Sequence, residues 1–207
     1  MKKLITDKHN EIRRKVKPTA ANMLKMVWNE NVAEQARKVS EQCLFQSSPM
    51  ASRTLGHMVC GENILQTNNF KEWAEVIKFW TAGKDYFKYG TGATDPAQNV
   101  FGYTQMIWYN SYQIGCSVSY CETATFPFLY ICHYCPGGNF VHQIPTPYKS
   151  GPTCEHCPGR CEDKLCTCGQ ISASVLHSVE LQFPVADTET SVVDAVKIKF
   201  PKTSKTL

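Results

Sequence analysis

The chain of 207 residues lacks several features that would place a protein in a well-defined class. No run of apolar residues approaches the ~18 that a membrane-spanning helix needs, so we expect no membrane span. Charged residues make up 19% of the sequence and the net charge is only +4, which is too weak to indicate a nucleic-acid partner. There is also no Asn-x-Ser/Thr sequon, so no N-linked sugar is expected on the surface.

Sequence features of processing and catalysis are missing as well. Met1 and two lysines lead directly into polar residues, without the apolar stretch of a signal peptide. If the protein is secreted, the sequence is then a mature form from which the signal peptide has been removed, and Met1 is an added start residue. No motif of a serine or cysteine nucleophile occurs, and the histidines His9, His142, His156 and His177 have no neighbours that suggest nucleophilic catalysis. We therefore expect no enzymatic activity.

Cysteine is the residue that the chain has in abundance. Eleven cysteines occur, and nine fall within residues 116–168, a density typical of extracellular modules held together by disulfides. They are Cys43, Cys60, Cys116, Cys121, Cys132, Cys135, Cys154, Cys157, Cys161, Cys166 and Cys168. Because cytosolic thiols stay reduced, disulfides here would indicate an extracellular protein.

A zinc ribbon is the alternative interpretation of these cysteines. Cys132 and Cys135, followed by Cys154 and Cys157, have the spacing of zinc ligands. A single tetrahedral zinc site uses four sulfurs and leaves seven of the eleven cysteines unexplained, whereas disulfides can pair ten of them. The count therefore favours disulfides and secretion over zinc.

Residues 1–147 have the pattern of a mixed domain of helices and strands. Apolar residues at helical spacing predict one helix over 32–43, capped by Asn29 or Asn31, and a second that starts at Phe70. Segments rich in β-branched and aromatic residues are predicted as strands at 104–109, 113–120 and 126–134. A sheet covered by helices follows from this order.

Two shorter regions complete the chain. Residues 148–168 begin with a linker composition and then hold five cysteines, in a segment too short to have a core of its own. Residues 169–207 contain no cysteine and carry a near-repeat, 174–184 against 191–201, in which apolar and polar residues alternate as in half-buried strands. This tail is either a β-hairpin docked on the main domain or a loosely attached, disordered segment.

Several motifs resemble those of the cysteine-rich secretory proteins (CRISPs) of the CAP superfamily. They are NMLKMVW at 22–28, CGENI at 60–64, YTQMIWY at 103–109, LYICHYCPGGNF at 129–140 and the cysteine spacing of 151–167. The resemblance covers residues 4–167 nearly without gaps and implies an α+β fold. It consists of a three-layer α-β-α CAP sandwich (SCP/PR-1-like) over 1–147, a hinge with two disulfides over 148–168, and a cysteine-free tail over 169–207.

The resemblance also implies a disulfide pairing, which the cysteine spacing alone does not give. The implied pairs are Cys43–Cys121, Cys60–Cys135 and Cys116–Cys132 in the sandwich, and Cys154–Cys161 and Cys157–Cys166 in the hinge. This pairing divides both Cys-x-x-Cys motifs among different partners, which a zinc ribbon would not tolerate. Cys168 is left unpaired, so we expect either a monomer with a free thiol or a dimer linked through Cys168.

Many relatives have a cavity with two histidines and two glutamates, a set of side chains able to bind a divalent metal. At the matching positions this chain has Ser47 and Gly102 in place of the histidines and Gly83 in place of one glutamate, so only Glu62 remains. One carboxylate cannot hold zinc or act as both acid and base. The resemblance therefore implies no metal, no cofactor and no catalytic residue in this chain.

Two histidines are candidates for the missing ligands. His57 could substitute for one of them, although it lies ten residues from the family position at Ser47. His133 lies on a predicted strand between disulfide cysteines and is expected to be structural.

The six-cysteine domain that blocks ion channels in venom CRISPs does not follow Cys166 in this sequence. The chain is therefore similar to the truncated, allurin-type CRISPs of amphibian egg jelly, which are diffusible sperm chemoattractants. This resemblance implies a secreted, extracellular, non-enzymatic signalling protein that takes part in fertilization by binding a receptor or membrane protein on the sperm surface. The alternative is a reproductive-tract or venom-type CRISP that binds sperm or modulates ion channels.

The hinge is the candidate surface for contact with such a partner. Residues expected to be exposed there are Tyr148, Lys149, His156, Arg160 and Lys164. The mildly basic chain would favour an anionic cell surface. A rigid spacer is the alternative role of the hinge.

Overall fold

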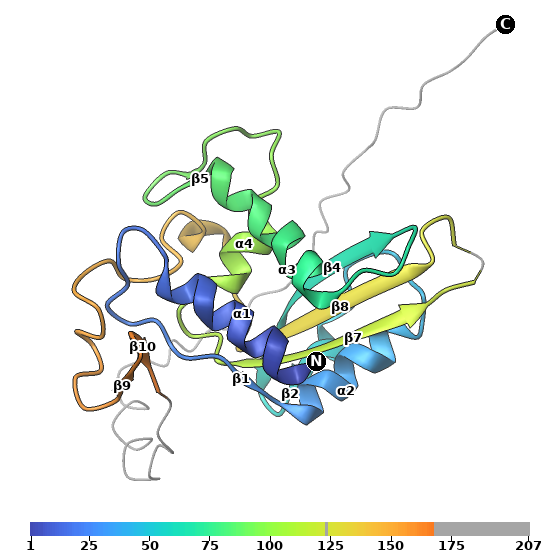
Figure 1. Cartoon of the computed structure of the whole chain (residues 1–207), viewed down its shortest axis with the longest axis horizontal. Coiled ribbons are helices and arrows are strands. Elements are labelled where there is room, and N and C mark those ends of the chain that lie inside the picture. The colour runs from blue at the N-terminus through green and yellow to red at the C-terminus, as the bar shows by residue number, and fades with distance from the viewer. Residues whose placement is uncertain (123, 168–207) are drawn as a thin grey trace, which may run out of the picture. The chain divides into compact units, whose positions relative to one another are not determined.

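The structure is a computed structural model and describes residues 1–122 and 124–167 (Figure 1). The predicted tail over 169–207, with its near-repeat, and the state of Cys168 lie outside the described residues. The described helices include none that is long and apolar enough to cross a membrane.

A four-stranded sheet forms the middle layer of the fold, in the order β1-β7-β8-β4. Its strands are β1 (Val27–Trp28), β4 (Gly61–Thr67), β7 (Gln113–Tyr120) and β8 (Phe128–Cys135). β1 pairs with β7 in parallel, whereas β7 and β4 both pair with β8 in antiparallel fashion. All residues of β8 except the first are buried, as expected for a strand with neighbours on both sides. The strands predicted over 113–120 and 126–134 are therefore confirmed as the central pair.

Helices cover both faces of this sheet, as Figure 1 shows. On one face lies α2 (Glu30–Ser40), and on the other lie α1 (Lys2–Arg14), α3 (Trp73–Thr81) and α4 (Phe101–Met106). Leu129 and Ile131 of β8 pack in one core cluster with residues of α2. Tyr130 and Tyr134 point to the opposite face and pack with residues of α1 and α3. This alternation produces the three-layer α-β-α sandwich that the resemblance implies.

The first predicted helix begins at one of its two predicted caps. The side chain of Asn29 accepts hydrogen bonds from the backbone N–H groups of Asn31 and Val32, so Asn29 is the cap. Short elements connect the sandwich: η1 (Met50–Arg53), β2 (Thr54–Leu55), β3 (Met58–Val59), η2 (Ala82–Tyr86), β5 (Phe87–Lys88), β6 (Gly92–Ala93) and η3 (Val141–Gln143).

The strand predicted over 104–109 is wrong, because its first residues belong to α4. Thr104, Gln105 and Met106 are all buried there. The hydroxyl of Thr104 donates to the carbonyl of Val100 one turn earlier (3.2 Å) and also to Asn139 Oδ1 (2.6 Å). Tertiary packing thus overrides the β propensity of this segment.

The second predicted helix starts later than expected. Glu72 and Glu75 form a capping box, in which each side chain binds the backbone N–H of the other residue, and the helix begins between them at Trp73. Phe70 precedes this cap and is 53% exposed, so its assignment to the buried helix face is wrong.

Five disulfides join the described cysteines. They are Cys43–Cys121, Cys60–Cys135, Cys116–Cys132, Cys154–Cys161 and Cys157–Cys166, the pairs that the family resemblance implies. Cys116 and Cys132 lie directly opposite each other in β7 and β8. Cys60–Cys135 continues the pairing of β4 with β8 by one position. The register on both sides of β8 is therefore fixed covalently.

The hinge, residues 148–167, packs against the segment that follows α1. The N–H of Ala21 donates to the carbonyl of Lys149 (2.8 Å), and the N–H of Lys25 donates to the carbonyl of Cys166 (2.7 Å). Within the hinge, β9 (Cys161–Glu162) and β10 (Leu165–Cys166) form a hairpin. The sandwich and the described hinge thus belong to one compact unit.

Tyr148 is buried, so its predicted exposure is wrong. It is 3% exposed, its hydroxyl donates to the carbonyl of Pro18 (2.9 Å), and its ring centroid lies 5.0 Å from that of Tyr89. Burial raises the pKa of Tyr148 above its ordinary value. A tyrosine can be buried when its hydroxyl finds a partner, and this one anchors the start of the hinge to the sandwich.

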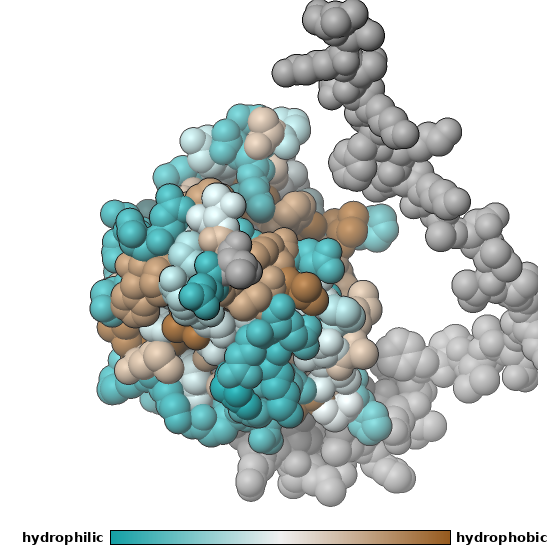
Figure 2. Space-filling view, turned by 90° about the vertical axis from the view of Figure 1, so that its right-hand side faces the viewer, coloured by the Kyte–Doolittle hydropathy of each residue, from teal (hydrophilic) through white to brown (hydrophobic). Residues whose placement is uncertain are grey.

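The far ends of β7 and β4 and the start of β8 lie on the side of the molecule opposite the hinge (Figure 1). Aromatic side chains gather there. Tyr120 is 63% exposed and Phe70 53%. Phe128 lies between them, with ring centroids 5.3 Å from Tyr120 and 5.9 Å from Phe70. Figure 2 shows this face with its hydrophobic areas interrupted by hydrophilic ones. Exposed apolar side chains in such a mixture are common on protein surfaces.

Candidate functional site

A cavity of about 460 Å³, termed the β4 cavity, lies beside β4 and between η2 and the start of α4. Its walls include Ser47, Glu62, Gly83 and Gly102. These are the four positions at which relatives carry two histidines and two glutamates. They come from four separate segments of the chain, and the fold brings them to one cavity.

The carboxylate of Glu62 is the one ionisable group among these four positions, and it is already engaged. The backbone N–H of Ser48 donates to Oε1 (2.9 Å) and the hydroxyl of Ser48 to Oε2 (2.7 Å), while His133 Nε2 lies 3.1 Å from Oε2. Burial by itself raises the pKa of Glu62, but the hydrogen bonds from His133 and Ser48 outweigh it and hold the pKa below its ordinary value. Glu62 is therefore ionised at neutral pH and fixed within the wall, with 3% of its side chain exposed.

Backbone atoms approach the two glycines closely. A Cβ atom on Gly83 would lie 2.9 Å from the carbonyl oxygen of Asn99, and one on Gly102 would lie 3.3 Å from that of Trp80. A backbone carbonyl cannot turn away as a flexible side chain can. A glutamate at 83 or a histidine at 102 would therefore require the surrounding loop to move.

The residues of the β4 cavity do not fit a divalent metal. Zinc sites use three or four nitrogen, sulfur or carboxylate ligands from the protein. The four positions provide one carboxylate, and its oxygens already bind Ser48 and His133. His133 is 0% exposed, and its Nε2 is engaged with Glu62. The four positions therefore do not provide the ligand set of a zinc site.

The deeper wall of the cavity is a neutral hydrogen-bonded network. Asn63 Nδ2 donates to the carbonyl of Gly102 (3.0 Å) and to the hydroxyl of Tyr134 (3.2 Å). The same hydroxyl lies 3.0 Å from His9 Nε2. Burial is the main cause that lowers the pKa of His9 to about 4, so this histidine is uncharged at neutral pH. The network rigidly links the cavity wall to α1.

Aromatic side chains line the outer part of the cavity. Phe79, Tyr86 and Phe101 all contribute to its walls, and they are 63%, 41% and 52% exposed. With a neutral network behind and aromatic rings in front, the cavity can hold a neutral or apolar group. It offers no unpaired charge from the four family positions.

The two histidines considered as metal ligands have other positions. His57 is exposed in the turn between β2 and β3 and is not part of the β4 cavity wall. His133 is structural, but the sequence predictions do not identify it, or Ser48, as a partner of Glu62. The signal was present in the pair Cys60–Cys135. Counting two residues inward from each cysteine along antiparallel strands pairs Glu62 with His133, which is the register observed.

The hinge is the second candidate surface. Its exposed predicted residues are Lys149, His156, Arg160 and Lys164. The hinge carboxylates of Asp163 and Glu162 are used within the unit, because they pair with Arg14 (2.7 Å) and Lys25 (2.5 Å) of the sandwich. Within residues 1–122 and 124–167, no ion pair involves Lys149, Arg160 or Lys164. These basic side chains remain available to an anionic partner.

Known proteins share this sequence pattern and fold. Residues 6–134 match the family model described as "Cysteine-rich secretory protein family", abbreviated CAP. Among solved structures, Na-ASP-1 is 28% identical with a TM-score of 0.66; the match covers 80% of this chain but 46% of Na-ASP-1, so this chain spans less than half of that protein. NaASP2, solved with Zn²⁺, is 24% identical over 80% of this chain and 94% of its own, with a TM-score of 0.66. Venom allergen-like protein 4 of Schistosoma mansoni is 21% identical over 75% of this chain and 97% of its own, with a TM-score of 0.59. The last two likenesses concern the fold alone.

Proposed function

The chain belongs to the cysteine-rich secretory protein (CAP) family, and on that basis we propose that it is a secreted protein that acts by binding and not by catalysis. Five disulfides within the described residues, 1–122 and 124–167, support an extracellular setting. The observation that carries the proposal is the state of the β4 cavity. Its one remaining carboxylate, Glu62, is hydrogen-bonded to Ser48 and His133, and backbone oxygens lie close to where a Cβ atom at Gly83 or Gly102 would be.

The proposed role is that of a diffusible sperm chemoattractant of egg jelly, acting through a receptor or membrane protein on the sperm surface. Support comes from the resemblance to allurin-type CRISPs and from the unpaired basic side chains of the hinge. Lys149, Arg160 and Lys164 are exposed and free of ion pairs among the described residues. Such a surface favours encounter with the anionic surface of a cell.

A gradient assay with the recombinant protein tests this role directly. Sperm should bias their swimming toward the source of the protein, and the fluorescently labelled protein should bind to them. The double variant R160E/K164E should lose most of the binding, because it reverses the charge of two of the three unpaired basic side chains of the hinge. The matched control K84E/K88E makes the same change in net charge in η2 and β5, and should retain binding. Undirected swimming at every concentration would refute the chemoattractant role, and equal losses in both variants would refute the role of the hinge.

Zinc is the alternative ligand, since the neighbour NaASP2 was solved with Zn²⁺. We expect this chain to retain only substoichiometric zinc after equilibration with zinc and dialysis, because the β4 cavity provides a single, occupied carboxylate. Metal analysis of the dialysed protein measures it, and one zinc per chain would contradict the proposed state of the cavity.

A further inference from the structure

We propose that the hinge is a thiol-capture site. Exposed Cys161 takes up a small anionic thiol of the glutathione class as a mixed disulfide, and the neighbouring pair Cys157–Cys166 accommodates the thiolate that is displaced. The proposal concerns a site outside the β4 cavity and does not depend on the identity of a sperm-surface partner.

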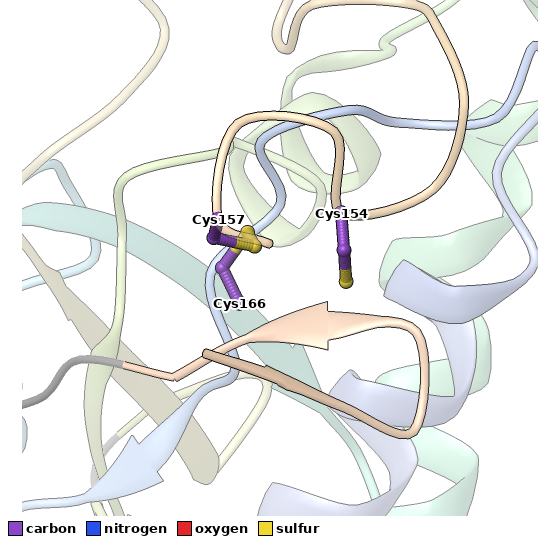
Figure 3. Close-up of side chains that lie close together, drawn as sticks. All are labelled: Cys154, Cys157 and Cys166. Carbon is purple, nitrogen blue, oxygen red and sulfur yellow. A yellow bond between two sulfur atoms is a disulfide. The ribbon is translucent and has the colours of Figure 1, made fainter. Parts of the chain in front are cut away.

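The two hinge disulfides lie next to each other. The sulfur atoms of Cys154, Cys157 and Cys166 are all within 4.8 Å of one another. Figure 3 shows the three side chains side by side. Cys154 is itself bonded to Cys161 and Cys157 to Cys166. Paired sulfurs are not thiolates, so this cluster is no metal site as it stands. Their proximity instead permits one disulfide to exchange with the other.

Burial determines where an external thiol can attack. Cys161 is exposed and Cys157 half-buried, whereas Cys154 and Cys166 are 6% and 2% exposed. Thiol–disulfide exchange depends on access to the sulfur that is attacked. Cys161 is therefore the entry point, and the sulfur displaced from it is the buried one of Cys154.

The exchange proceeds in two balanced steps. The external thiolate attacks Sγ of Cys161, the bond to Cys154 breaks, and its electron pair leaves with Cys154 as a thiolate. This buried thiolate is poorly solvated, and it attacks Sγ of Cys166 nearby, which breaks the bond between Cys157 and Cys166. Cys157 leaves as a thiolate and takes a proton from water. Two disulfides exist within the hinge before the reaction; afterwards there is one, Cys154–Cys166, and one mixed disulfide, so no oxidant or reductant is consumed.

The thiolate of Cys154 has both Cys157 and Cys166 within 4.8 Å, so access does not decide which of the two sulfurs it attacks. The ease with which the other sulfur leaves decides it instead. The better leaving sulfur is the one whose thiolate is stabilised more, because a lower thiol pKa speeds departure. Cys157 is half-buried and in contact with water, whereas Cys166 is 2% exposed. The new disulfide thus joins the two buried cysteines, and the released thiol lies at the surface.

Charge and backbone conformation favour the reaction at this place. Arg160 directly precedes Cys161, and Arg160 and Lys164 are exposed and in no ion pair among the described residues, whereas the intervening Glu162 and Asp163 are paired with Lys25 and Arg14. The unpaired charges beside the entry point are thus positive and favour a thiolate. Cys154 has φ of +62°, and Asp163 and Lys164 have φ of +47° and +66°, in the left-handed region that non-glycine residues adopt only when their surroundings hold them there. Opening the Cys154–Cys161 bond releases one of these constraints.

The sandwich disulfides provide the internal comparison. Among the residues that the structure describes, Cys154, Cys157 and Cys166 form the one group in which three cysteine sulfurs lie this close. In Cys60–Cys135 and Cys116–Cys132 both cysteines are buried, and in Cys43–Cys121 the more accessible residue, Cys43, is only half-buried, whereas Cys161 of the hinge is exposed. The sandwich disulfides should therefore exchange more slowly than the hinge under the same conditions.

Peptide mapping of the full chain by mass spectrometry tests the proposal. Any free thiol of the oxidised protein, including that of Cys168, is first blocked with N-ethylmaleimide. The protein is then incubated with reduced glutathione at about pH 8, where a useful fraction of thiol is ionised, and quenched with iodoacetamide. We expect glutathione on Cys161, a new Cys154–Cys166 bond and carbamidomethyl on Cys157, in equal amounts. The absence of an adduct, an adduct first on a sandwich cysteine, or alkylated Cys154 with Cys157–Cys166 intact would each overturn the proposal.

Variants distinguish stable capture of the thiol by exchange between the two hinge disulfides from simple reaction at an accessible cysteine. The variant C157S/C166S removes the accepting disulfide, so the Cys154 thiolate should expel glutathione again and the stable adduct should fall by at least about tenfold. R160E should slow capture of anionic glutathione by up to about tenfold but should not slow capture of the cationic thiol cysteamine. Unchanged adduct in C157S/C166S, or equal slowing for both thiols in R160E, would contradict the mechanism. If C157S/C166S fails to fold, peptide mapping of the unaltered chain still tests the proposal.

Discussion

The sandwich and the hinge use disulfides for different purposes. The sandwich buries apolar side chains on both faces of its sheet, and its three disulfides lie within or beside that core. In the hinge, by contrast, the buried residues from 148 to 167 are Tyr148, Cys154, Leu165 and Cys166. Half of this small set is cysteine. Disulfides therefore add stability to a core in the sandwich, whereas they replace the core in the hinge.

Removing one disulfide from each region is the strongest test of this difference. C43S/C121S opens a link between residues 78 apart and should lower the free energy of unfolding of the sandwich by about 4 kcal/mol. C157S/C166S opens a link between residues 9 apart and should change the unfolding of the sandwich by less than about 1 kcal/mol, while hinge amides lose protection from hydrogen exchange. Urea unfolding followed by tryptophan fluorescence measures the first effect. A hinge variant that destabilises the sandwich as strongly would remove the distinction between the regions.

Arg13 and Arg14 compare the inside of the sandwich with its contact to the hinge. Arg13 is 1% exposed and donates to the backbone carbonyls of Leu24, Met106, Trp108 and Tyr109. R13A should cost about 3 to 4 kcal/mol, because it leaves these buried carbonyls without their donor.

Arg14 is the matched control for this loss. Its side chain is 26% exposed and pairs with Asp163 of the hinge (2.7 Å). R14A should cost no more than about 1 kcal/mol of global stability, since partly exposed ion pairs contribute little. Equal costs for R13A and R14A in urea unfolding would show that the hinge contact supports the sandwich as strongly as its own core does.

Acidification should affect the sandwich through His9. Burial lowers its pKa to about 4 from 6.5, so the unfolded chain binds a proton that the folded chain does not. The stability from this difference is present above about pH 6.5 and is lost as the pH falls toward 4, at about 1.4 kcal/mol per pH unit. Between about pH 7.5 and 5 we expect a loss of roughly 2 kcal/mol, measured by urea unfolding at each pH.

Two variants assign this pH dependence. H9Q should remove most of the pH dependence. H156Q, which changes an exposed hinge residue, should leave it intact. A pH profile that persists in H9Q would show that other groups dominate.

Two glycines compare the wall of the β4 cavity with the hinge. G83A should cost about 1 to 3 kcal/mol, because its Cβ would lie 2.9 Å from the carbonyl oxygen of Asn99 in the β4 cavity. G159A in the hinge meets no atom within 4 Å and should be neutral or stabilising by less than about 1 kcal/mol. Thermal unfolding of both variants checks the difference, and a neutral G83A would show that the cavity wall can yield.

Much of the sandwich is predictable because its segments have a clear composition or period. The β-branched and aromatic residues of β7 and β8 and the helical spacing of α2 are visible in the sequence, and Asn29, one of the two predicted caps, caps α2 in the structure. The segment of α4 is not predictable in this way. Its β-branched and aromatic residues resemble a strand, and only the packing of Thr104 and Gln105 into the protein makes it helical.

The candidate site shows the same limit. The resemblance identifies the positions Ser47, Glu62, Gly83 and Gly102, and the fold brings all of them to one cavity. It does not reveal that Glu62 is engaged, because Ser48 reaches it only through the fold. Tyr148 was expected at the surface from its place in a polar linker, but its burial depends on a carbonyl at Pro18, 130 residues away in sequence. Interactions at this sequence distance leave no local pattern.

The disulfide topology has a consequence for proteolysis. Cys43–Cys121, Cys60–Cys135 and Cys116–Cys132 overlap along the chain, so a single cut anywhere between Cys43 and Cys135 leaves both pieces covalently joined. Both hinge disulfides join one hinge cysteine to another, and no described disulfide connects the hinge with the sandwich. Between the two sets lies the segment with Phe140 and Val141, which are 59% and 77% exposed. One cut there would leave the sandwich and the hinge held together, among the described residues, by non-covalent contacts alone, such as the buried Tyr148 and the ion pairs of Arg14 and Lys25.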